Sequence, residues 1–277
     1  MKPTQLFLFT CLLLLNACYQ AEVPDLNSCR VTRMDNLRFA DINKVEAYDF
    51  KYDQKGRIKE LLFFQKDETS LANAQKFKFV TIYDETSGKP VRLDGYQNKE
   101  TKVLYYYNLE TNEKGQVTKA SYFFGQPPSG TPQAINTYTY DEAGNLSLAQ
   151  YADLRTVIAT NRYVYDDFGN LTEYYEKSGN STEKLVEKYT AYDNKFNVLQ
   201  IQNSTLVVAF FQTNLYLSKN NVLKSEVYSS TGSLLEQVVH SYQYNRQGFP
   251  FVLKETYLTP AGNLKFAFDY TAQYQCP

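Results

Sequence analysis

The sequence predicts an all-β protein, an antiparallel up-and-down meander of about 16–18 strands between residues 30 and 275. Three observations support this prediction. A turn phrase of the form aromatic–Asp–x–x–Gly–Asn–aliphatic recurs along the chain. The segments between these turns alternate with a period of two, as in residues 136–140, where tyrosines and threonines alternate. Beyond the N-terminal apolar run, no stretch has the i, i+3, i+4, i+7 apolar spacing of an amphipathic helix.

The N-terminal segment predicts export and lipid attachment. A positive charge at residue 2 precedes an apolar run over residues 6–15, which is too short to span a bilayer and is typical of a cleavable signal peptide, residues 1–17. Residues 15–18 (Leu-Asn-Ala-Cys) resemble a bacterial lipobox, which implies cleavage before Cys18 and a diacyl lipid on that cysteine. A plain secretory signal is the alternative. Residues 18–29 then form a spacer, and residues 30–277 form a single β-domain.

The turn phrase predicts hairpins with a defined register. Its best copies run from Tyr140 to Leu146 and from Tyr165 to Leu171. Asp can accept a backbone hydrogen bond within the turn, and Gly adopts a positive φ at little cost, which suits a three-residue loop with a bulge. That geometry places each tyrosine opposite the aliphatic residue. The alternative, a row of calcium-binding or catalytic carboxylates, explains less well why one Asp begins each turn. We expect turn centres near Gly56, Gly88, Gly115, Gly144, Gly169, Phe196, Asn220 and Gly248, with second turns around Gly179, Gly232 and Gly262.

The aromatic composition has two interpretations. The chain contains 25 Tyr and 18 Phe but no Trp. Tyrosine suits a pleated, half-hydrated sheet, where its ring packs and its hydroxyl meets water. Alternatively, aromatic rings form a surface that stacks on sugars, although the absence of Trp weakens this reading. Consecutive strand residues face opposite sides, so part of each tyrosine cluster faces away from the other part. The candidate ligand-binding residues are Tyr105, Tyr106, Tyr107, Tyr174 and Tyr175.

Two cysteines remain after removal of the signal peptide and modification of Cys18. Cys29 and Cys276 flank the repeat region. In an oxidising compartment an isolated pair favours a disulfide, which would fasten the first strand to the last. Two free thiols are the alternative.

The sequence shows no catalytic, metal or cofactor motif, and we expect no enzyme activity. His240 is the only histidine, and it lies on a predicted strand, so neither a zinc site nor a Cys-His pair is available. A Ser-His-Asp triad stays open, because its members need not be close in sequence. The pair Asp166-Asp167 resembles turn residues more than a glycosidase pair. A net charge of −1 without a basic block predicts no nucleic-acid partner.

The phrase Tyr-x-Tyr-Asp-x-x-Gly-Asn-Leu, best matched at residues 138–146 and 163–171, resembles the YD repeat of Rhs and teneurin proteins, where it builds a β-shell. Together with the lipobox, the chain resembles Bacteroidetes-type lipoproteins of unknown function with degenerate YD-like repeats, some of which have a porin-like barrel. The resemblance covers residues 30–276 and implies a large barrel. An open, twisted sheet folded into two layers is the alternative. One strand face is rich in Lys, Thr, Ser and Glu, and mean hydropathy is −0.49, which favours a tethered barrel with its aromatic face inward.

We therefore expect a lipoprotein of the outer membrane, at its periplasmic face or on the cell surface, that binds a polymer or partner or acts as a scaffold. Its partners would be the membrane, through the lipid on Cys18, and a glycan or a protein. A carbohydrate-binding or carbohydrate-processing accessory protein is the alternative function.

Overall fold

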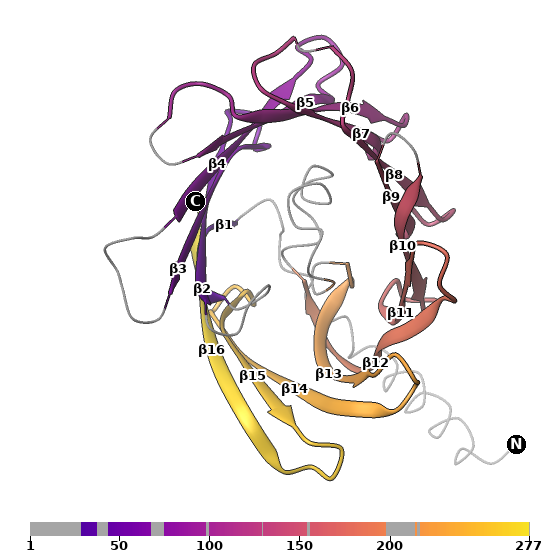
Figure 1. Cartoon of the computed structure of the whole chain (residues 1–277). Helices are drawn as coiled ribbons and strands as arrows, with labels where there is room; N and C mark the ends of the chain where they lie inside the picture. Colours follow the sequence, from indigo (N-terminus) through magenta and orange to yellow (C-terminus); the bar gives the residue numbers. More distant parts are fainter. Residues whose placement is uncertain are drawn as a thin grey trace, which may run out of the picture.

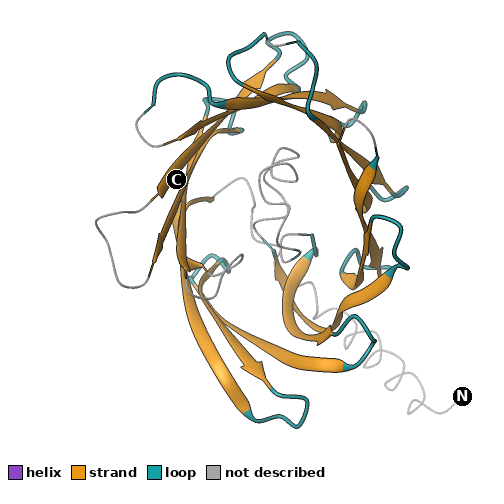
Figure 2. Ribbon diagram, in the orientation of Figure 1, coloured by secondary structure: helices purple, strands orange, loops and turns teal. Residues whose placement is uncertain are grey.

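The computed structural model describes residues 29–37, 44–67, 75–97, 100–128, 130–153, 156–197, 214 and 217–276, so the predicted signal peptide and Cys18 lie outside the described residues. The described chain forms 16 antiparallel strands in sequence order, and β1 pairs with β16 to close a barrel (Figure 1). Figure 2 shows strands and loops throughout the described part. The all-β prediction is confirmed, and the alternative of an open two-layer sheet is wrong.

The strands are β1 (Arg30–Leu37), β2 (Lys44–Tyr52), β3 (Ile58–Asp67), β4 (Gln75–Tyr83), β5 (Pro90–Gln97), β6 (Tyr105–Thr111), β7 (Val117–Phe124), β8 (Ala134–Tyr140), β9 (Leu146–Asp153), β10 (Val157–Tyr165), β11 (Leu171–Ser178), β12 (Lys184–Phe196), β13 (Asn220–Tyr228), β14 (Leu234–Tyr244), β15 (Pro250–Leu258) and β16 (Leu264–Gln275). In the described part of the chain, no helix is long and apolar enough to cross a membrane.

The turn phrases form the hairpins that the sequence predicts. Tyr140 pairs with Leu146, and Tyr165 pairs with Leu171, each next to a register shift. In the first of these turns, Gly144 has φ +92° and donates its N–H to the Asp141 carbonyl at 3.0 Å. The Asp141 carboxylate accepts the Asn145 N–H at 2.8 Å. Asp, Gly and Asn are therefore backbone devices in this turn.

The phrase turns share one rim of the barrel, because alternate connections of an antiparallel meander lie at the same end. We call this end the phrase rim; it comprises connections 53–57, 84–89, 112–116, 141–145, 166–170 and 245–249 and the pair Cys29–Cys276. Two predicted turn centres are wrong. Phe196 ends β12 and pairs with Asn220, the first residue of β13, so both belong to a single connection.

Side-chain hydrogen bonds at the phrase rim connect successive turns. In three turns, the residue that follows the turn glycine donates a side-chain hydrogen bond to a backbone carbonyl of the next turn. The three bonds run from Arg57 to Gly88 (2.9 Å), from Lys89 to Asn112 (2.9 Å) and from Gln116 to Gly144 (2.7 Å). The hairpins that turn at 53–57, 84–89 and 112–116 are thus each fixed to the next hairpin of the phrase rim.

A second set of links lies just inside the barrel. A tyrosine at or near the end of one hairpin's first strand donates its hydroxyl to the carbonyl of the aliphatic residue that begins the second strand of the preceding hairpin. We call these contacts tyrosine latches. They join Tyr83 to Ile58 (2.9 Å), Tyr140 to Val117 (2.9 Å), Tyr165 to Leu146 (3.0 Å) and Tyr192 to Leu171. The tyrosine of the phrase therefore packs within its own hairpin, and its hydroxyl forms a hydrogen bond with the preceding hairpin.

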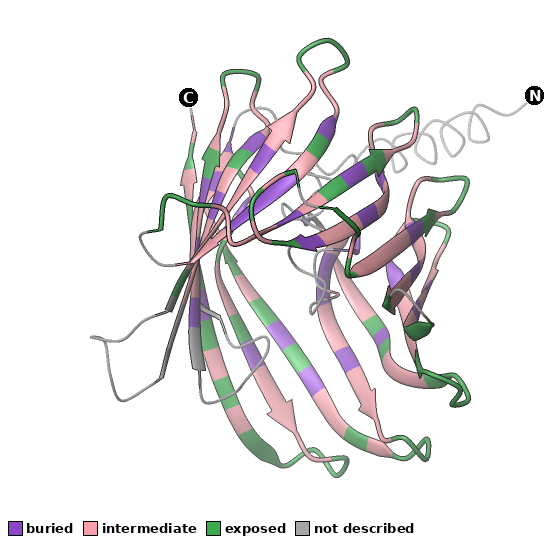
Figure 3. Ribbon diagram, turned by 45° about the horizontal axis from the view of Figure 1, so that its top comes forward, coloured by how far each residue is buried: buried purple, intermediate pink, exposed green. Residues whose placement is uncertain are grey.

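The two faces of the sheet differ in chemistry. Along β16, Phe268 and Tyr270 belong to a packed apolar cluster, whereas Asp269 and Thr271 are exposed. Figure 3 shows this alternation of buried and exposed residues along the strands. In a closed sheet the side chains of the concave face converge, so the aromatic, buried alternate is the inner wall. Two clusters of buried apolar residues cover this wall, one centred on β5–β13 and one on β1–β4 and β16.

The outer face carries ion pairs on the strands next to the phrase rim. Lys51 meets Glu60 at 2.9 Å, and Lys119 meets Glu110 at 2.7 Å. Charged and polar side chains on the outward positions are the opposite of the continuous apolar outer band of a membrane-spanning barrel.

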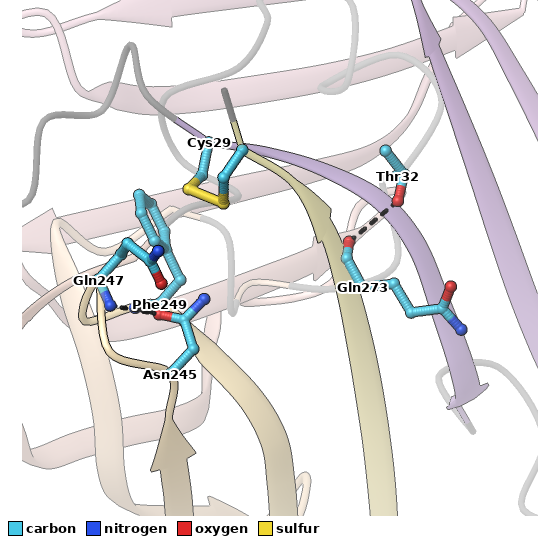
Figure 4. The surroundings of a disulfide bond; sticks show 7 residues. Cys29, Thr32, Asn245, Gln247, Phe249 and Gln273 are labelled. Atoms are coloured by element: carbon cyan, nitrogen blue, oxygen red, sulfur yellow. Dashed lines mark hydrogen bonds between the residues drawn. A yellow bond between two sulfur atoms is a disulfide. The ribbon is translucent and has the colours of Figure 1, made fainter.

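A disulfide between Cys29 and Cys276 joins the start of the first strand, β1, to the end of the last strand, β16. The Cα atoms are 4.1 Å apart, and the sequence separation is 247. Figure 4 shows it beside Phe249, which packs with both cysteines in a small buried cluster. The bond that the sequence predicts therefore lies where β1 and β16 meet at the phrase rim.

Candidate functional site on the inner wall

The tyrosines of β6 divide between the two faces. Tyr105 and Tyr107 lie on the inner wall, and their rings meet edge to face at 6.1 Å between centroids. Tyr106 points the other way, is 2% exposed and stacks on Phe123 at 4.8 Å. Tyr106 therefore has no free ring face to offer a ligand, contrary to the expectation from the sequence.

A glycine shapes the wall next to Tyr105. Gly95 lies on β5 opposite Tyr105, and a Cβ at Gly95 would lie 2.4 Å from the Tyr105 ring. Only a glycine lets this ring lie flat across the neighbouring strand. Tyr122 contacts the same ring at 5.7 Å, so β5, β6 and β7 together present a partly buried aromatic surface.

The tyrosines of β11 divide in the same way. Tyr174 faces inward and stacks on Tyr163 at 5.5 Å. Tyr175 faces outward, where the Arg162 guanidinium lies 3.8 Å from its ring centroid and its hydroxyl donates to Glu173 at 2.7 Å. Of the five predicted ligand-binding tyrosines, the structure places Tyr105, Tyr107 and Tyr174 on the inner wall.

A buried polar group on β12–β16 was not predicted from the sequence. We call Glu187, His240 and Glu255 the inner acidic cluster. His240 and Glu255 are paired in register on β14 and β15, and His240 Nδ1 lies 3.4 Å from a Glu255 carboxyl oxygen. The hydroxyls of Tyr257 and Tyr270 donate to Glu255 at 3.1 and 2.5 Å.

Glu187 lies close enough to interact electrostatically with Glu255. The Tyr189 hydroxyl donates to Glu187 at 2.5 Å, and the Ser225 hydroxyl donates to it at 2.7 Å. The Ser225 hydroxyl is thus engaged in a hydrogen bond with the Glu187 carboxylate. Both His240 ring nitrogens are buried and have no hydrogen-bond partner among the described residues, so those residues assemble no Ser-His-Asp triad around this histidine.

Burial governs the charge of this cluster. Desolvation raises the pKa of Glu255 to about 7, against the hydrogen bonds from Tyr270 and Tyr257 that lower it. Desolvation also raises the pKa of Glu187 and lowers the pKa of His240 to about 4. Although the atoms of His240 and Glu255 are close enough for an ion pair, near neutral pH the imidazole is uncharged and Glu255 is about half protonated.

An aromatic group adjoins the cluster. The rings of Tyr257, Phe266 and Phe268 lie on the inner wall with centroids 4.5, 6.1 and 5.3 Å apart, and all three side chains are partly exposed. Nearby, the Lys265 ammonium lies 5.8 Å from the Phe266 ring centroid and forms an ion pair with Glu236.

A sequence signal for the cluster exists in the spacing Glu-x-Tyr, which places both side chains on one face of a strand. On the inner wall this spacing gives hydrogen-bonded pairs at Glu46/Tyr48, Glu187/Tyr189 and Glu255/Tyr257, and on the outer face at Glu173/Tyr175 and Glu226/Tyr228. Among the described residues, no group of three or more His, Cys, Asp or Glu side chains could hold a metal ion.

No protein-family model and no curated protein sequence matches this chain. The fold is similar to that of a porin-like protein from Bacteroides uniformis, with a TM-score of 0.59 and 14% identity over 88% of this chain and 96% of that chain. A porin-like protein from Bacteroides vulgatus is similar with a TM-score of 0.44 and 14% identity, over 88% of this chain and 98% of that chain.

The Tc holotoxin pore of Photorhabdus luminescens matches 78% of this chain and 14% of that chain, with a TM-score of 0.31 and 13% identity. The second and third TM-scores are too low to identify a fold, and at this sequence identity the first shows the fold alone. The predicted porin-like fold is confirmed, whereas lipid anchoring and kinship with YD-repeat proteins stay predictions.

Proposed function

We propose that this chain is a lipid-anchored envelope protein that binds a polymer or partner on the inner wall of its barrel, without chemical turnover. The observation that carries the proposal is the sidedness of the sheet. Aromatic and acidic side chains face inward, while the outward positions carry ion pairs such as Arg162 with Glu183 at 2.6 Å. Barrels of about 16–18 strands leave interior space that wall side chains do not fill.

The unpartnered nitrogens of His240 add support. Buried polar groups in proteins are generally hydrogen-bonded, to protein or to another molecule. A buried, bond-free imidazole on the inner wall favours an interior that receives polar molecules. Because the described residues place the only histidine of the sequence in no catalytic arrangement, we propose binding without turnover.

The location of the protein follows from the lipobox-like residues before Cys18. Because charged pairs lie on the outer face, we propose that the barrel stands beside the membrane on a lipid tether. Mass spectrometry of the mature N-terminus should find a diacylated Cys18. A free N-terminus at another residue would contradict the anchor and leave a plain secretory signal.

A carbohydrate ligand is the second candidate, favoured by the partly exposed rings of Tyr105, Tyr107 and Tyr174 on the inner wall. The test is a glycan array with wild type, Tyr107→Ala and Tyr175→Ala. The inner-wall variant should lose sugar binding, and the outer-face variant should keep it. Equal loss in both variants would contradict an inner-wall site, and release of cleaved glycan would contradict a non-enzymatic role.

A further inference from the structure

We propose that the inner acidic cluster, with the aromatic group of Tyr257, Phe266 and Phe268, is a subsite for a positively charged ammonium group of the bound ligand. This inference rests on the proposed function, and it names the chemical class of the ligand. The two carboxyl groups supply negative charge, and the ring faces supply quadrupoles that attract a cation.

The first argument is the balance of charge on this part of the wall. The inward positions of β14 and β15 carry Glu236, His240 and Glu255, while the lysine of β15, Lys254, lies on the outer face opposite Asp269. Lys265, the second residue of β16, brings an ammonium to this part of the wall, where it pairs with Glu236. Within the described part of the chain, Glu255 has no ion-pair partner other than the uncharged imidazole, and Glu187 has none.

The second argument is the arrangement of Lys265 itself. Its ammonium lies over the Phe266 ring and pairs with Glu236. The same combination of an aromatic ring and a carboxyl group recurs one step along the strands, where Phe268 and Tyr257 adjoin Glu255. There no described residue supplies an ammonium group, so a ligand can supply it.

The third argument is His240. Its side chain is 3% exposed, neither ring nitrogen has a hydrogen-bond partner in the part of the chain that the structure describes, and Nδ1 lies 3.4 Å from a Glu255 carboxyl oxygen. A neutral imidazole offers one N–H donor and one acceptor nitrogen, and the acceptor nitrogen suits an N–H group of the ligand. The titratable groups around the two carboxyls are Tyr189 on β12, His240 and Tyr242 on β14, Tyr257 on β15 and Tyr270 on β16, and none is cationic near neutral pH.

The elevated pKa of Glu255 agrees with this assignment. A carboxyl group that is desolvated without a compensating cation stays partly protonated, as Glu255 does with its pKa of about 7. An ammonium group nearby favours the carboxylate, so binding should release a proton near neutral pH.

The test compares two trisaccharides of equal length at pH 7 by calorimetry, one of β-1,4-linked glucosamine and one of N-acetylglucosamine. Only the first carries ammonium groups. Wild type should prefer it by about tenfold, in line with a cation held by a ring and a carboxylate. Glu255→Gln and Glu187→Gln should each reduce this preference. Glu173→Gln, which removes a carboxylate from a matched Glu-x-Tyr pair on the outer face, should keep it.

A second measurement needs no variant. The quaternary N-trimethyl form of the glucosamine trisaccharide has a charge that does not titrate, and its binding to wild type in two buffers of different ionisation enthalpy should show proton release. Equal affinity for charged and acetylated sugars, a preference that survives both Gln substitutions, or binding without proton release would each overturn the ammonium subsite and leave the proposed binding function standing. Failure of both sugars to bind would overturn the ammonium subsite and the carbohydrate ligand together, and would leave the binding of another polymer or partner on the inner wall standing.

Discussion

Gly144 adopts φ +92°, a conformation that L side chains rarely adopt. A Cβ added there would meet only Gln116 and Lys114 side-chain atoms, at 3.5 and 3.9 Å, so space is not limiting. We expect Gly144→Val to lower the free energy of unfolding by about 1–2 kcal/mol, through backbone strain alone. Gly130 is the matched control, because it has no positive φ and nothing within 4 Å of its Cβ position. Equal losses for both variants in urea unfolding would contradict this account.

Asp141 tests the alternative reading of the turn aspartates. One carboxylate oxygen accepts the Asn145 backbone N–H at 2.8 Å, and the other accepts the Asn145 side-chain amide at 3.0 Å. Asparagine keeps one acceptor oxygen, so Asp141→Asn should leave the thermal midpoint nearly unchanged. A large loss of ligand binding at unchanged stability would restore the metal or catalytic reading.

His240 and Glu255 predict opposite pH dependences of stability. Between about pH 4 and 6.5 the unfolded chain binds a proton at His240 that the folded protein does not, so this residue makes stability rise with pH. Between about pH 4.5 and 7 the folded protein binds a proton at Glu255 that the unfolded chain does not, so this residue makes stability fall with pH. In wild type the two slopes oppose each other.

Single variants separate these slopes. Relative to wild type, Glu255→Gln should gain stability as pH rises from 4.5 to 7, and His240→Gln should lose stability as pH rises from 4 to 6.5, each by on the order of 3 kcal/mol. Urea unfolding across this range measures both. Parallel curves for wild type and the two variants would show that neither group titrates as proposed.

At the level of the hairpin, the tyrosine latches predict a cost for losing a single hydroxyl. Tyr165→Phe leaves the Leu146 carbonyl without its 3.0 Å bond, and Tyr140→Phe does the same to Val117. We expect each to lower the free energy of unfolding by about 0.5–1.5 kcal/mol. Tyr175→Phe, whose hydroxyl bonds Glu173 on the outer face, should cost less. A cost at Tyr175 equal to that at Tyr165 would argue against the latch.

The hairpins were predictable because their determinants are local. Asp141, Gly144 and the pairing of Tyr140 with Leu146 follow from turn chemistry within seven consecutive residues. The latches were not predictable in this way, because the reach of Tyr165 to Leu146 depends on how two hairpins pack. The predicted turn centres at Phe196 and Asn220 were wrong for a related reason. Both residues resemble turn residues, yet they pair with each other at the two ends of one long connection.

At the scale of the whole molecule, neither the closure of the barrel nor the candidate site can be predicted from local sequence patterns. Period-two alternation assigns side chains to faces but does not decide whether the sheet closes, which depends on twist and shear summed over all the strands. Glu187, His240 and Glu255 come from β12, β14 and β15, and the register of the successive strand pairs from β12 to β15 brings them together. The sequence could place Tyr105 and Tyr106 on opposite faces, but it could not show that Phe123 covers the outward ring.

The Cys29–Cys276 disulfide contributes a covalent link to the closed barrel, and its contribution to stability can be tested. β1 and β16 already pair through main-chain contacts such as Arg30 with Gln275, so the barrel has a second means of staying closed. The bond spans a sequence separation of 247 residues. Loop-entropy models give about 5 kcal/mol for such a loop, and measured losses for native disulfides are typically about 2–5 kcal/mol.

We therefore expect the Cys29→Ser, Cys276→Ser double variant to unfold at a lower urea concentration, with amide exchange of β1 and β16 accelerated before that of β8–β11. Reductant should shift wild type toward the variant and leave the variant unchanged. Unaltered stability on reduction would mean that strand pairing alone closes the barrel. Free thiols at both positions in non-reducing peptide mapping would remove the bond itself.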